Sequence, residues 1–307
     1  MSDQTALHSL ALDSLEEQIA VIDNSGKIVY VNRAWKDFGA ENGMFSDACG
    51  VGSNYLKVCN SSGSRGDSLA HEAEQGLRAV LNGQLATFHF QYPCHSPTEK
   101  RWFLMRIAPV RDASTSLFVV SHHNITQRKL AEEQAEYLSL HDPLTGLANR
   151  RQFNRFLDSE WRRNARNHSP LGFIMLDLDH FKDYNDELGH LAGDECLIRV
   201  AEVLSAYSGR PGDLAVRYGG EEFVLILGNT GPEESVQVAE AVRKDIYALD
   251  MRYRGTVRLS VSAGVASVVP SNQQTTLALI QDADHALYRA KQLGRNQVAY
   301  TQPPVTK

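Results

Sequence analysis

The sequence predicts two α+β domains joined by a helix, and three observations support this. The chain has 307 residues, whereas one domain usually takes about 100–200. Short β-rich runs alternate with helical patterns in two separate stretches. Between these stretches, residues 126–140 lack Gly and Pro and are rich in strong helix formers.

The first domain is expected over residues 14–126, as an antiparallel five-stranded sheet with small helices, after a loose start at 1–12. Residues 18–23 and 27–32 are β-rich, and Asn24-Ser25-Gly26 between them predicts a hairpin. The other expected elements are short helical patterns within 33–84 (one of them at 72–81), a loop at 61–66, and strands at 87–92, 101–110 and 116–122.

A helical linker is expected over residues 127–141. Leu130, Ala135 and Leu138 give it a narrow apolar stripe, through which two copies can pair as a short coiled coil. Asp142-Pro143 ends the helix, because the residue before proline disfavours the helical conformation.

Residues 142–303 predict an α/β domain with a central sheet. The expected helices are at 150–167, 181–188, 194–207, 232–249 and 275–292, and the expected strands at 171–178, 214–216, 223–227, 257–269 and 297–300.

Composition excludes several classes of protein. The net charge of −6 argues against general nucleic-acid binding. No apolar run approaches the roughly 20 residues of a membrane span, and the first residues lack a signal-peptide pattern, so we expect a cytoplasmic protein that does not contact the membrane. The four cysteines are too scattered for a disulfide framework and are expected as buried free thiols: Cys49, Cys59, Cys94 and Cys196.

Acidic residues follow the buried run 173–176. Carboxylates at a strand end are well placed to hold Mg²⁺ or Mn²⁺, and the first N–H groups of the next helix can hold phosphate. Asp177 and Asp179 supply the acids and Lys182 a cation. The alternative is that one of the acids simply caps the helix.

Gly219-Gly220 predicts a tight hairpin turn on which a nucleoside can lie, followed by Glu221 and Glu222. Lys291 and Arg295 are one helical turn apart and can share a face. Each feature alone also fits an exposed turn or a solvated helix face. Together, acids for a metal ion, glycines for a nucleoside and cations for a polyphosphate indicate nucleotidyl transfer.

The C-terminal half resembles a GGDEF domain of the diguanylate cyclases. The matching segments occur in order: 142–150, 177–182 with Asn185-Asp186, Gly189-His190 with Gly193-Asp194, 217–223, 260–264 and 288–296. The resemblance implies a nucleotidyl-cyclase-like palm that converts two GTP into cyclic di-GMP and two pyrophosphates. It also implies a homodimer, since one domain binds one GTP.

The resemblance assigns roles to matching positions. Asp177, the Leu178 carbonyl and Glu221 would hold the metal with help from Glu222, and Glu221 would deprotonate the attacking 3′-hydroxyl. Lys182 would stabilise the transition state. The other implied substrate-binding residues are Phe181, Lys182, Lys291 and Arg295 for the phosphates, Asn185 and Asp194 for the guanine edge, and His190, Gly219 and Gly220 nearby.

Arg210-Pro211-Gly212-Asp213 resembles the family's inhibitory site, where Arg210 and Asp213 would grip the product. The alternative is an ordinary Pro-Gly turn. The family often adds a further arginine, for which Arg243 is the nearest candidate, although the aligned position can equally be Ala241.

Residues 14–126 resemble a PAS sensor domain, through the hairpin at 22–32 and the closing segment at 121–126. Its ligand stays unknown, whether small molecule or cofactor. Tyr55 occupies the position nearest to the cysteine of flavin photoreceptors and argues against that chemistry. His71 is a candidate haem ligand or a solvated side chain, and Cys94-His95 is either part of a metal site or a simple loop.

These observations predict a PAS-GGDEF diguanylate cyclase that works as a homodimer, with the PAS domain and the product controlling its rate. One alternative is a non-catalytic signalling module that binds GTP or cyclic di-GMP. Another is a sensory scaffold that regulates a partner.

Overall fold

The computed structural model describes residues 2–42, 50–57, 68–96, 98–111, 116–271 and 273–301. The chain divides into two compact units, Met1–Glu133 and Gln134–Lys307, which we describe separately. Four predicted features lie outside the described residues: Cys49, Cys59, the loop at 61–66 and the domain end at 303.

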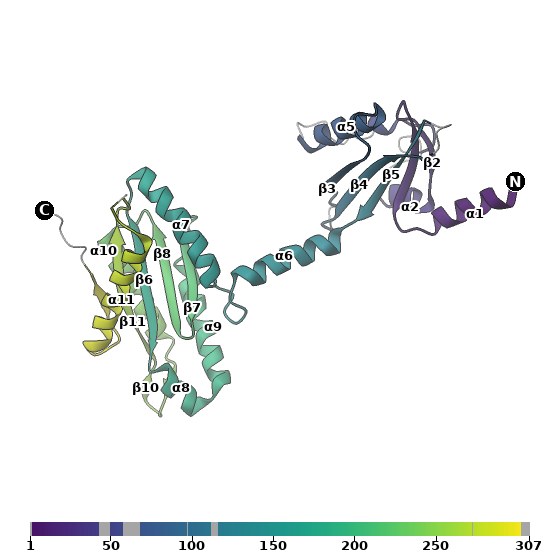
Figure 1. Ribbon diagram of the computed structural model, residues 1–307. Helices are drawn as coiled ribbons and strands as arrows, with labels where there is room; N and C mark the ends of the chain where they lie inside the picture. The colour runs from purple at the N-terminus through teal and green to yellow at the C-terminus, as the bar shows by residue number, and fades with distance from the viewer. Residues whose placement is uncertain are drawn as a thin grey trace. The chain divides into compact units, whose positions relative to one another are not determined.

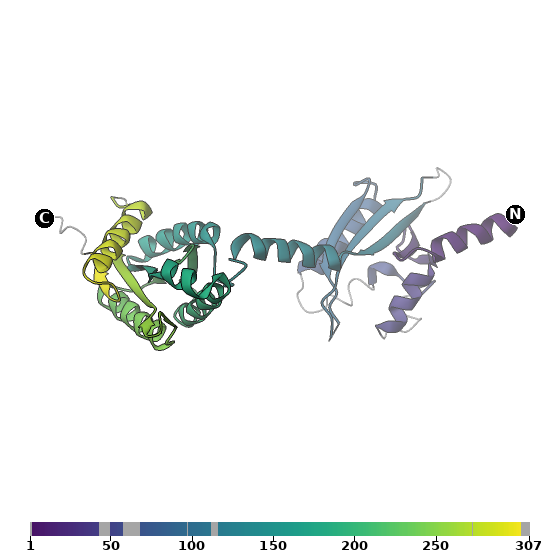
Figure 2. The same ribbon diagram turned by 90° about the horizontal axis from the view of Figure 1, so that it is seen from below.

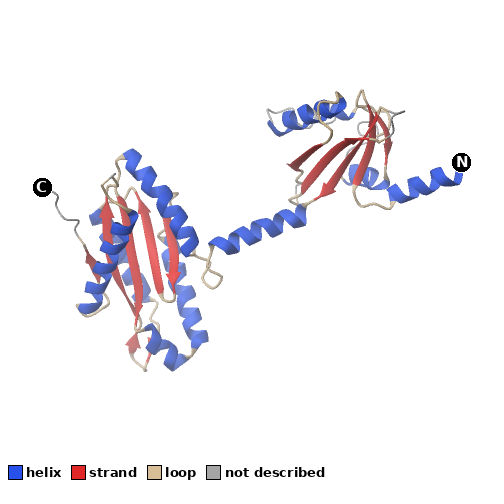
Figure 3. Cartoon of the chain, viewed as in Figure 1, coloured by secondary structure: helices blue, strands red, loops and turns tan. Residues whose placement is uncertain are grey.

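The N-terminal unit has the antiparallel five-stranded sheet that the sequence predicts, in the order β2-β1-β5-β4-β3 (Figure 3). Its strands are β1 Gln18–Asp23, β2 Ile28–Val31, β3 Phe88–Pro93, β4 Trp102–Pro109 and β5 Leu117–Asn124, and its helices are α1 Ser2–Asp13, α2 Arg33–Glu41 and α5 Ser68–Leu81. The loose start expected at 1–12 is wrong, because α1 occupies it. This segment contains no Gly or Pro and several strong helix formers, which favour helix.

Asn32 fastens the start of this unit. Its side chain is fully buried, and its Oδ1 accepts hydrogen bonds from the backbone N–H groups of Ile19 and Trp35. Its Nδ2 donates to the carbonyls of Leu12 and Glu17. One amide therefore caps α2 and ties the segment after α1 to β1.

The C-terminal unit has a five-stranded sheet in the order β12-β11-β6-β8-β7 (Figure 1). Its elements are α7 Arg150–Asn167, β6 Leu171–Asp179, α8 Phe181–Leu188, α9 His190–Ala206, β7 Asp213–Gly219, β8 Glu222–Gly228, α10 Pro232–Ala248, β9 Arg252–Tyr253, β10 Val257–Arg258, β11 Ser260–Val268, α11 Thr276–Gln292 and β12 Val298–Tyr300. Helix α6, Thr126–Leu140, precedes them and keeps Leu130 and Leu138 exposed.

Two expected boundaries of this unit are wrong. Helix α9 begins at His190 instead of 194, because Gly189, with φ of +84°, ends α8 and starts α9 at once. The strand expected at 257–269 is two strands, because β10 pairs with β9 in a separate hairpin and only β11 joins the main sheet.

The two-residue period of the strands divides the core of this unit into two layers. Ile174, Leu176 and Leu178 of β6 face α9 and α10, whereas Phe173 and Met175 face α7 and α11. Figure 2 shows the sheet between its helices. Odd-numbered positions of β6 therefore point toward α11.

Gly264 of β11 lies directly against the backbone of α11. A Cβ atom at this position would lie 2.1 Å from the Ala283 carbonyl oxygen and 2.2 Å from the Leu287 nitrogen. Both are backbone atoms, which cannot move away without shifting the helix.

Gly264→Ala is therefore expected to lower the free energy of unfolding by about 3 kcal/mol, as overpacking of a core does. Urea denaturation of the full chain measures this. Gly209→Ala is the control, because a Cβ there meets nothing within 4 Å, and it should change the free energy by less than about 0.5 kcal/mol. Equal effects of the two substitutions would contradict the close packing.

Candidate active site

Three acidic residues gather where β6 ends beside the turn between β7 and β8. Asp177 of β6 pairs directly with Glu222, the first residue of β8. The Leu178 N–H donates to the Glu221 carbonyl at 3.4 Å. Gly220 makes this turn possible with φ of +56°, a conformation that side chains disfavour.

Lys291, in the last turn of α11, contacts this group from the face of the sheet that α11 covers. Its Nζ lies 2.8 Å from Asp177 Oδ1, and the two side chains are 34% and 13% exposed. Burial raises the pKa of Asp177 above its ordinary value, and although the ion pair with Lys291 opposes this, the charges of Glu221 and Asp179 add to it. The site is therefore short of positive charge.

Glu222 also lies where there is too little positive charge. Burial and the charge of Asp177 raise its pKa, Lys291 lowers it, and Glu221 and Asp284 raise it further. Asp284 of α11 is a neighbour that the sequence analysis did not identify. Its spacing of seven residues from Lys291, two helical turns, was the available signal.

Helix α8 starts immediately beyond β6. Its N-cap is His180, with φ of +58° and no side-chain capping bond, so neither Asp177 nor Asp179 caps it. Phe181 is buried at the first helical position, and Lys182 is exposed at the second. The uncapped first turn can offer its N–H groups to an anion.

Asn185 of α8 has its side chain packed against Gly193 of α9. Its Oδ1 is buried and, within the described part of the chain, has no hydrogen-bond partner. A Cβ at Gly193 would lie only 1.8 Å from this atom, so a glycine is required there. His190 and Asp194 are exposed one turn apart at the start of α9, next to this orphan acceptor.

A second ion pair, absent from the sequence analysis, fixes the glycine turn. Arg217 donates through Nε to the Gly220 carbonyl at 3.0 Å and through Nη1 to Asp142 Oδ1 at 3.0 Å. Burial would raise the pKa of Asp142, but hydrogen bonds from Thr145 and Arg217 prevail and hold it below its ordinary value. The segment that follows α6 is thereby tied to the turn that carries Glu221.

The residues present fit a magnesium ion. Mg²⁺ is usually bound by one or two carboxylates together with substrate phosphates, and Asp177, Glu221 and the Leu178 carbonyl lie on adjoining backbone at the strand end. In the parts of the chain that the structure describes, no three His, Cys, Asp or Glu side chains are arranged to hold a metal on their own. The phosphates of a nucleotide would have to complete the coordination.

Arg210 and Asp213 bracket the turn before β7. Asp213 Oδ1 accepts from the Gly228 N–H at 3.1 Å, while Arg210 is 71% exposed, with Glu234 4.0 Å away. Burial raises the pKa of Asp213, although the Gly228 bond and the charge of Arg210 oppose it. The turn thus combines one anchored carboxylate and one exposed guanidinium, which pairs with Glu234 at the limit of ion-pair distance.

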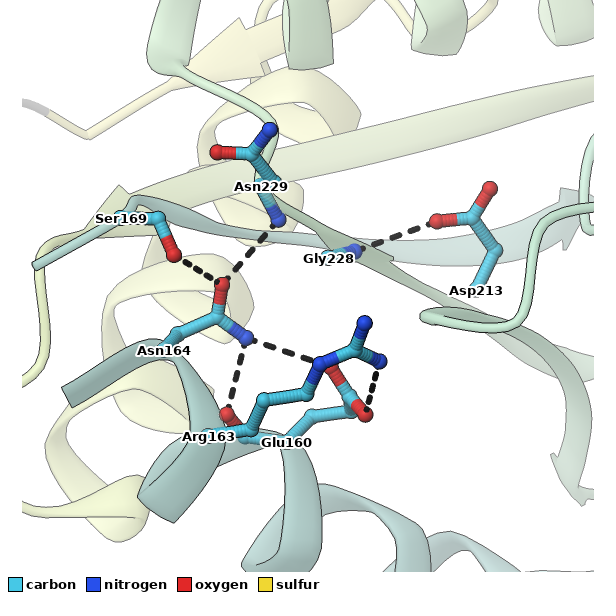
Figure 4. A network of polar contacts seen from close by, with 7 residues as sticks. All are labelled: Glu160, Arg163, Asn164, Ser169, Asp213, Gly228 and Asn229. Atoms are coloured by element: carbon cyan, nitrogen blue, oxygen red, sulfur yellow. Dashed lines mark hydrogen bonds and ion pairs between the residues drawn. The ribbon is translucent and has the colours of Figure 1, made fainter. Parts of the chain in front are cut away.

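A buried network supports this turn from the side of α7 (Figure 4). Asn164 donates to the Glu160 carbonyl and accepts from the Ser169 hydroxyl and the Asn229 N–H. Glu160, itself buried, pairs with Arg163. Arg243, the candidate further arginine, is engaged elsewhere, with Glu240 and Asn296.

The interior of the N-terminal unit holds a polar triad. Buried His122 contacts the Tyr55 hydroxyl through Nε2 at 2.9 Å and the Tyr92 hydroxyl through Nδ1 at 2.6 Å. Burial lowers the pKa of His122 to about 4, so it is neutral at pH 7. The sequence analysis missed this histidine, because its partners come from distant segments.

The other residues considered in that unit lie outside this triad. His71 is exposed on α5 and bonds Gln75. His95 accepts from the Arg101 N–H, and Cys94 is a partly buried free thiol.

The comparison with protein families identifies the C-terminal unit. A family model described as diguanylate cyclase, GGDEF domain, matches residues 139–297, more than half of the chain. The chain belongs to this family. A second model, the PAS fold, matches residues 12–130, in agreement with the five-stranded sheet.

Curated relatives share the catalytic half. Diguanylate cyclase DgcM of Escherichia coli is 37% identical over 190 residues, which are 62% of this chain and 45% of DgcM. Diguanylate cyclase DgcP of Pseudomonas aeruginosa is 38% identical over 167 residues, which are 54% of this chain and 24% of DgcP. The chain thus spans less than half the length of these relatives.

Among solved structures, the coiled coil and GGDEF domain of DgcB from Caulobacter crescentus, in complex with c-di-GMP, matches with a TM-score of 0.53 and 30% identity. The match covers 57% of this chain and 93% of that one.

Within the described residues, none of the helices has the length and apolar character of a membrane span.

Glu222→Gln is expected to stabilise the metal-free protein. The folded state raises the pKa of Glu222, so ionisation costs stability once the pH exceeds the ordinary value of 4.5. At pH 7.5 the variant should gain up to about 1 kcal/mol, and below pH 4 the gain should vanish, because Glu222 is then protonated in both states. Thermal denaturation in the presence of a chelator measures this gain. Glu202→Gln, on an exposed helix face, is the control. A gain that persists at low pH would exclude charge repulsion.

Proposed function

We propose that this chain is a diguanylate cyclase, which condenses two GTP into cyclic di-GMP and two pyrophosphates. The supporting observation is the pairing of Asp177 with Glu222 at the strand end, with Glu221 in the turn and Lys291 as the neighbouring cation. Membership of the GGDEF family gives this arrangement its chemistry.

In this proposal Asp177, the Leu178 carbonyl and Glu221 hold Mg²⁺ or Mn²⁺, and Glu222 assists. The bound ion supplies positive charge at the reacting phosphate. Glu221 accepts the proton of the 3′-hydroxyl that attacks the α-phosphate, and pyrophosphate leaves.

The remaining residues bind and orient GTP. Lys182 and the uncapped N–H groups of α8 face the phosphates, and Lys182 also stabilises charge in the transition state. Asn185, with its orphan Oδ1, accepts from the guanine edge together with Asp194. The other substrate contacts are Phe181, His190, Gly219, Gly220, Lys291 and Arg295.

We infer that catalysis requires a homodimer. The cyclic product contains two phosphodiester bonds, and each catalytic unit carries one such site for one GTP. Two sites must therefore face each other. Exposed Leu130 and Leu138 on α6 give the linker an apolar stripe for pairing with a second copy.

We propose two ways in which the activity is regulated, by product binding and by the PAS unit. Exposed Arg210 would bind a guanine edge of the product in bidentate fashion, and Asp213 would hold the other side of the product. The PAS unit, with an unidentified small molecule or cofactor, would control how the two catalytic units meet.

Glu221→Gln is expected to lower cyclic di-GMP formation by about 100-fold or more, because the 3′-hydroxyl loses its base and the metal loses a charged ligand. Chromatography of products from GTP and Mg²⁺ measures this, and Glu202→Gln should retain full activity. A wild type that binds GTP without forming product, at any protein concentration, would support the non-catalytic binding module instead. If cellular signalling persists in Glu221→Gln, this result would support the alternative of a sensory scaffold that regulates a partner.

Arg210→Ala should relieve inhibition by cyclic di-GMP and leave the initial rate within about twofold, because the Arg210 turn precedes β7 at the opposite end of the β7–β8 pair from Glu222 and Asp177. Initial rates with added product measure this. Arg111→Ala, at an exposed arginine of the N-terminal unit, should leave inhibition unchanged. Unaltered inhibition in Arg210→Ala would show that Arg210 and Asp213 form an ordinary turn and do not bind the product.

A further inference from the structure

The loop after α11 has an unusual backbone. Gly294, Arg295 and Asn296 have φ of +116°, +63° and +47°, so three consecutive residues adopt the left-handed region. Only glycine enters this region without strain. The Arg295 N–H donates to the Ala290 carbonyl at 3.1 Å, which closes the end of the helix but does not hold Asn296.

Asp179 holds Asn296 from the strand that also carries Asp177. Its Oδ2 accepts from the Asn296 N–H at 3.0 Å and from the Ser260 hydroxyl at 2.7 Å, and its Oδ1 accepts from the Ser262 hydroxyl at 2.7 Å. The residue is only 3% exposed. Three donors satisfy this buried carboxylate, as buried charges require, so it does not act as a metal ligand beside Asp177.

Arg243 of α10 holds the same residue from the other direction. Its Nη1 donates to Asn296 Oδ1 at 2.9 Å, and its Nε pairs with Glu240. Asn296 is thus fixed by its backbone from β6 and by its side chain from α10. Arg295, the residue between the helix and this double anchor, has little freedom to move.

We propose that Asp179 is a positioning residue, which sets the phosphate-binding position of Arg295 through the backbone of Asn296. This inference rests on the proposed function, in which Arg295 binds the phosphates of GTP. One strand, β6, then presents the metal carboxylate Asp177 and, two residues later on the same face, fixes the loop that binds the phosphates. Metal ion and polyphosphate are held at a constant spacing.

The test is a double-mutant cycle between Asp179 and Arg295 in the full chain. Asp179→Asn keeps the shape of the side chain but removes the charged acceptor. Arg295→Ala removes the group that the loop presents. Calorimetric affinity for a GTP analogue with a methylene between the α- and β-phosphates is measured for wild type, both single variants and the double variant, together with kcat and KM for GTP.

Asp179→Asn should weaken analogue binding by at least about tenfold, because a misplacement of about 1 Å can cost about 100-fold. In the Arg295→Ala background, Asp179→Asn should weaken analogue binding by less than about twofold, because the phosphate-binding side chain that Asp179 positions is then absent. Equal losses in both backgrounds would overturn the proposal and leave Asp179 a purely structural residue.

Ser262→Ala is the matched control. It removes one donor to the same carboxylate but leaves the bond from Asp179 Oδ2 to Asn296, so binding should stay within about twofold of wild type. A tenfold loss in this variant would show that any disturbance of the carboxylate suffices, and would contradict positioning through Asn296.

Arg243→Met provides a second route if Asp179→Asn does not fold. It removes the side-chain anchor of Asn296 and should weaken binding in the same direction, again only when Arg295 is present. A loss independent of Arg295 would overturn the proposal. A wild type that binds the analogue but forms no cyclic di-GMP would refute the cyclase activity alone, since the binding cycle does not depend on turnover.

Discussion

The two-residue period of β6 decides where the chemistry of the catalytic unit lies. Because β6 is the central strand, its odd positions face α11 and its even positions face α9 and α10. Asp177 therefore meets Lys291 of α11, and Glu222, its partner on β8, lies beside it. A shift of register by one residue would bury both acids against the opposite helices. The close contact of α11 at Gly264 keeps this helix at the distance from which Lys291 can reach.

Much of this arrangement could be predicted from the sequence. Acids after an apolar run and a Gly-Gly turn identified the strand end and the hairpin, because each pattern is local. The shared helical face expected for Lys291 and Arg295 is wrong, because α11 ends at Gln292 and Arg295 lies in the loop that follows, with φ of +63°. The roles of Asp179 and His122 could not be predicted this way. The Asn296 N–H that donates to Asp179 is 117 residues away, and the Tyr55 hydroxyl that contacts His122 is 67 residues away. The start of α9 was missed because Gly189 alone separates α8 from α9, so no loop marks the boundary between the two helices.

The catalytic turn is connected to the segment that enters the unit. Asn149 caps α7 and also donates to the carbonyls of Ser139 and His141, at the end of α6. A few residues earlier, Asp142 binds Arg217, which in turn holds the Gly220 carbonyl. A change in how α6 ends would thus reach the Gly220 turn through two hydrogen-bonded side chains. Such a short route would serve the proposed control of the catalytic unit by the PAS unit.

Charge supports the proposal that the site takes a metal ion and a polyphosphate together. Besides burial, the charge of Glu221 raises the pKa of both Asp177 and Glu222, and the charges of Asp177 and Asp284 raise that of Glu222 further. Lys291, which pairs with Asp177, opposes both shifts. A nucleotide alone would meet repulsion from these acids, and a divalent ion alone would leave the cations near the phosphate positions without partners. In the proposed function a metal–nucleotide complex would meet both demands, since the carboxylates would hold its ion and Lys182 and Arg295 would bind its phosphates. Burial and the neighbouring carboxylates raise the pKa of Asp177 and Glu222, and a bound cation would offset the repulsion between them.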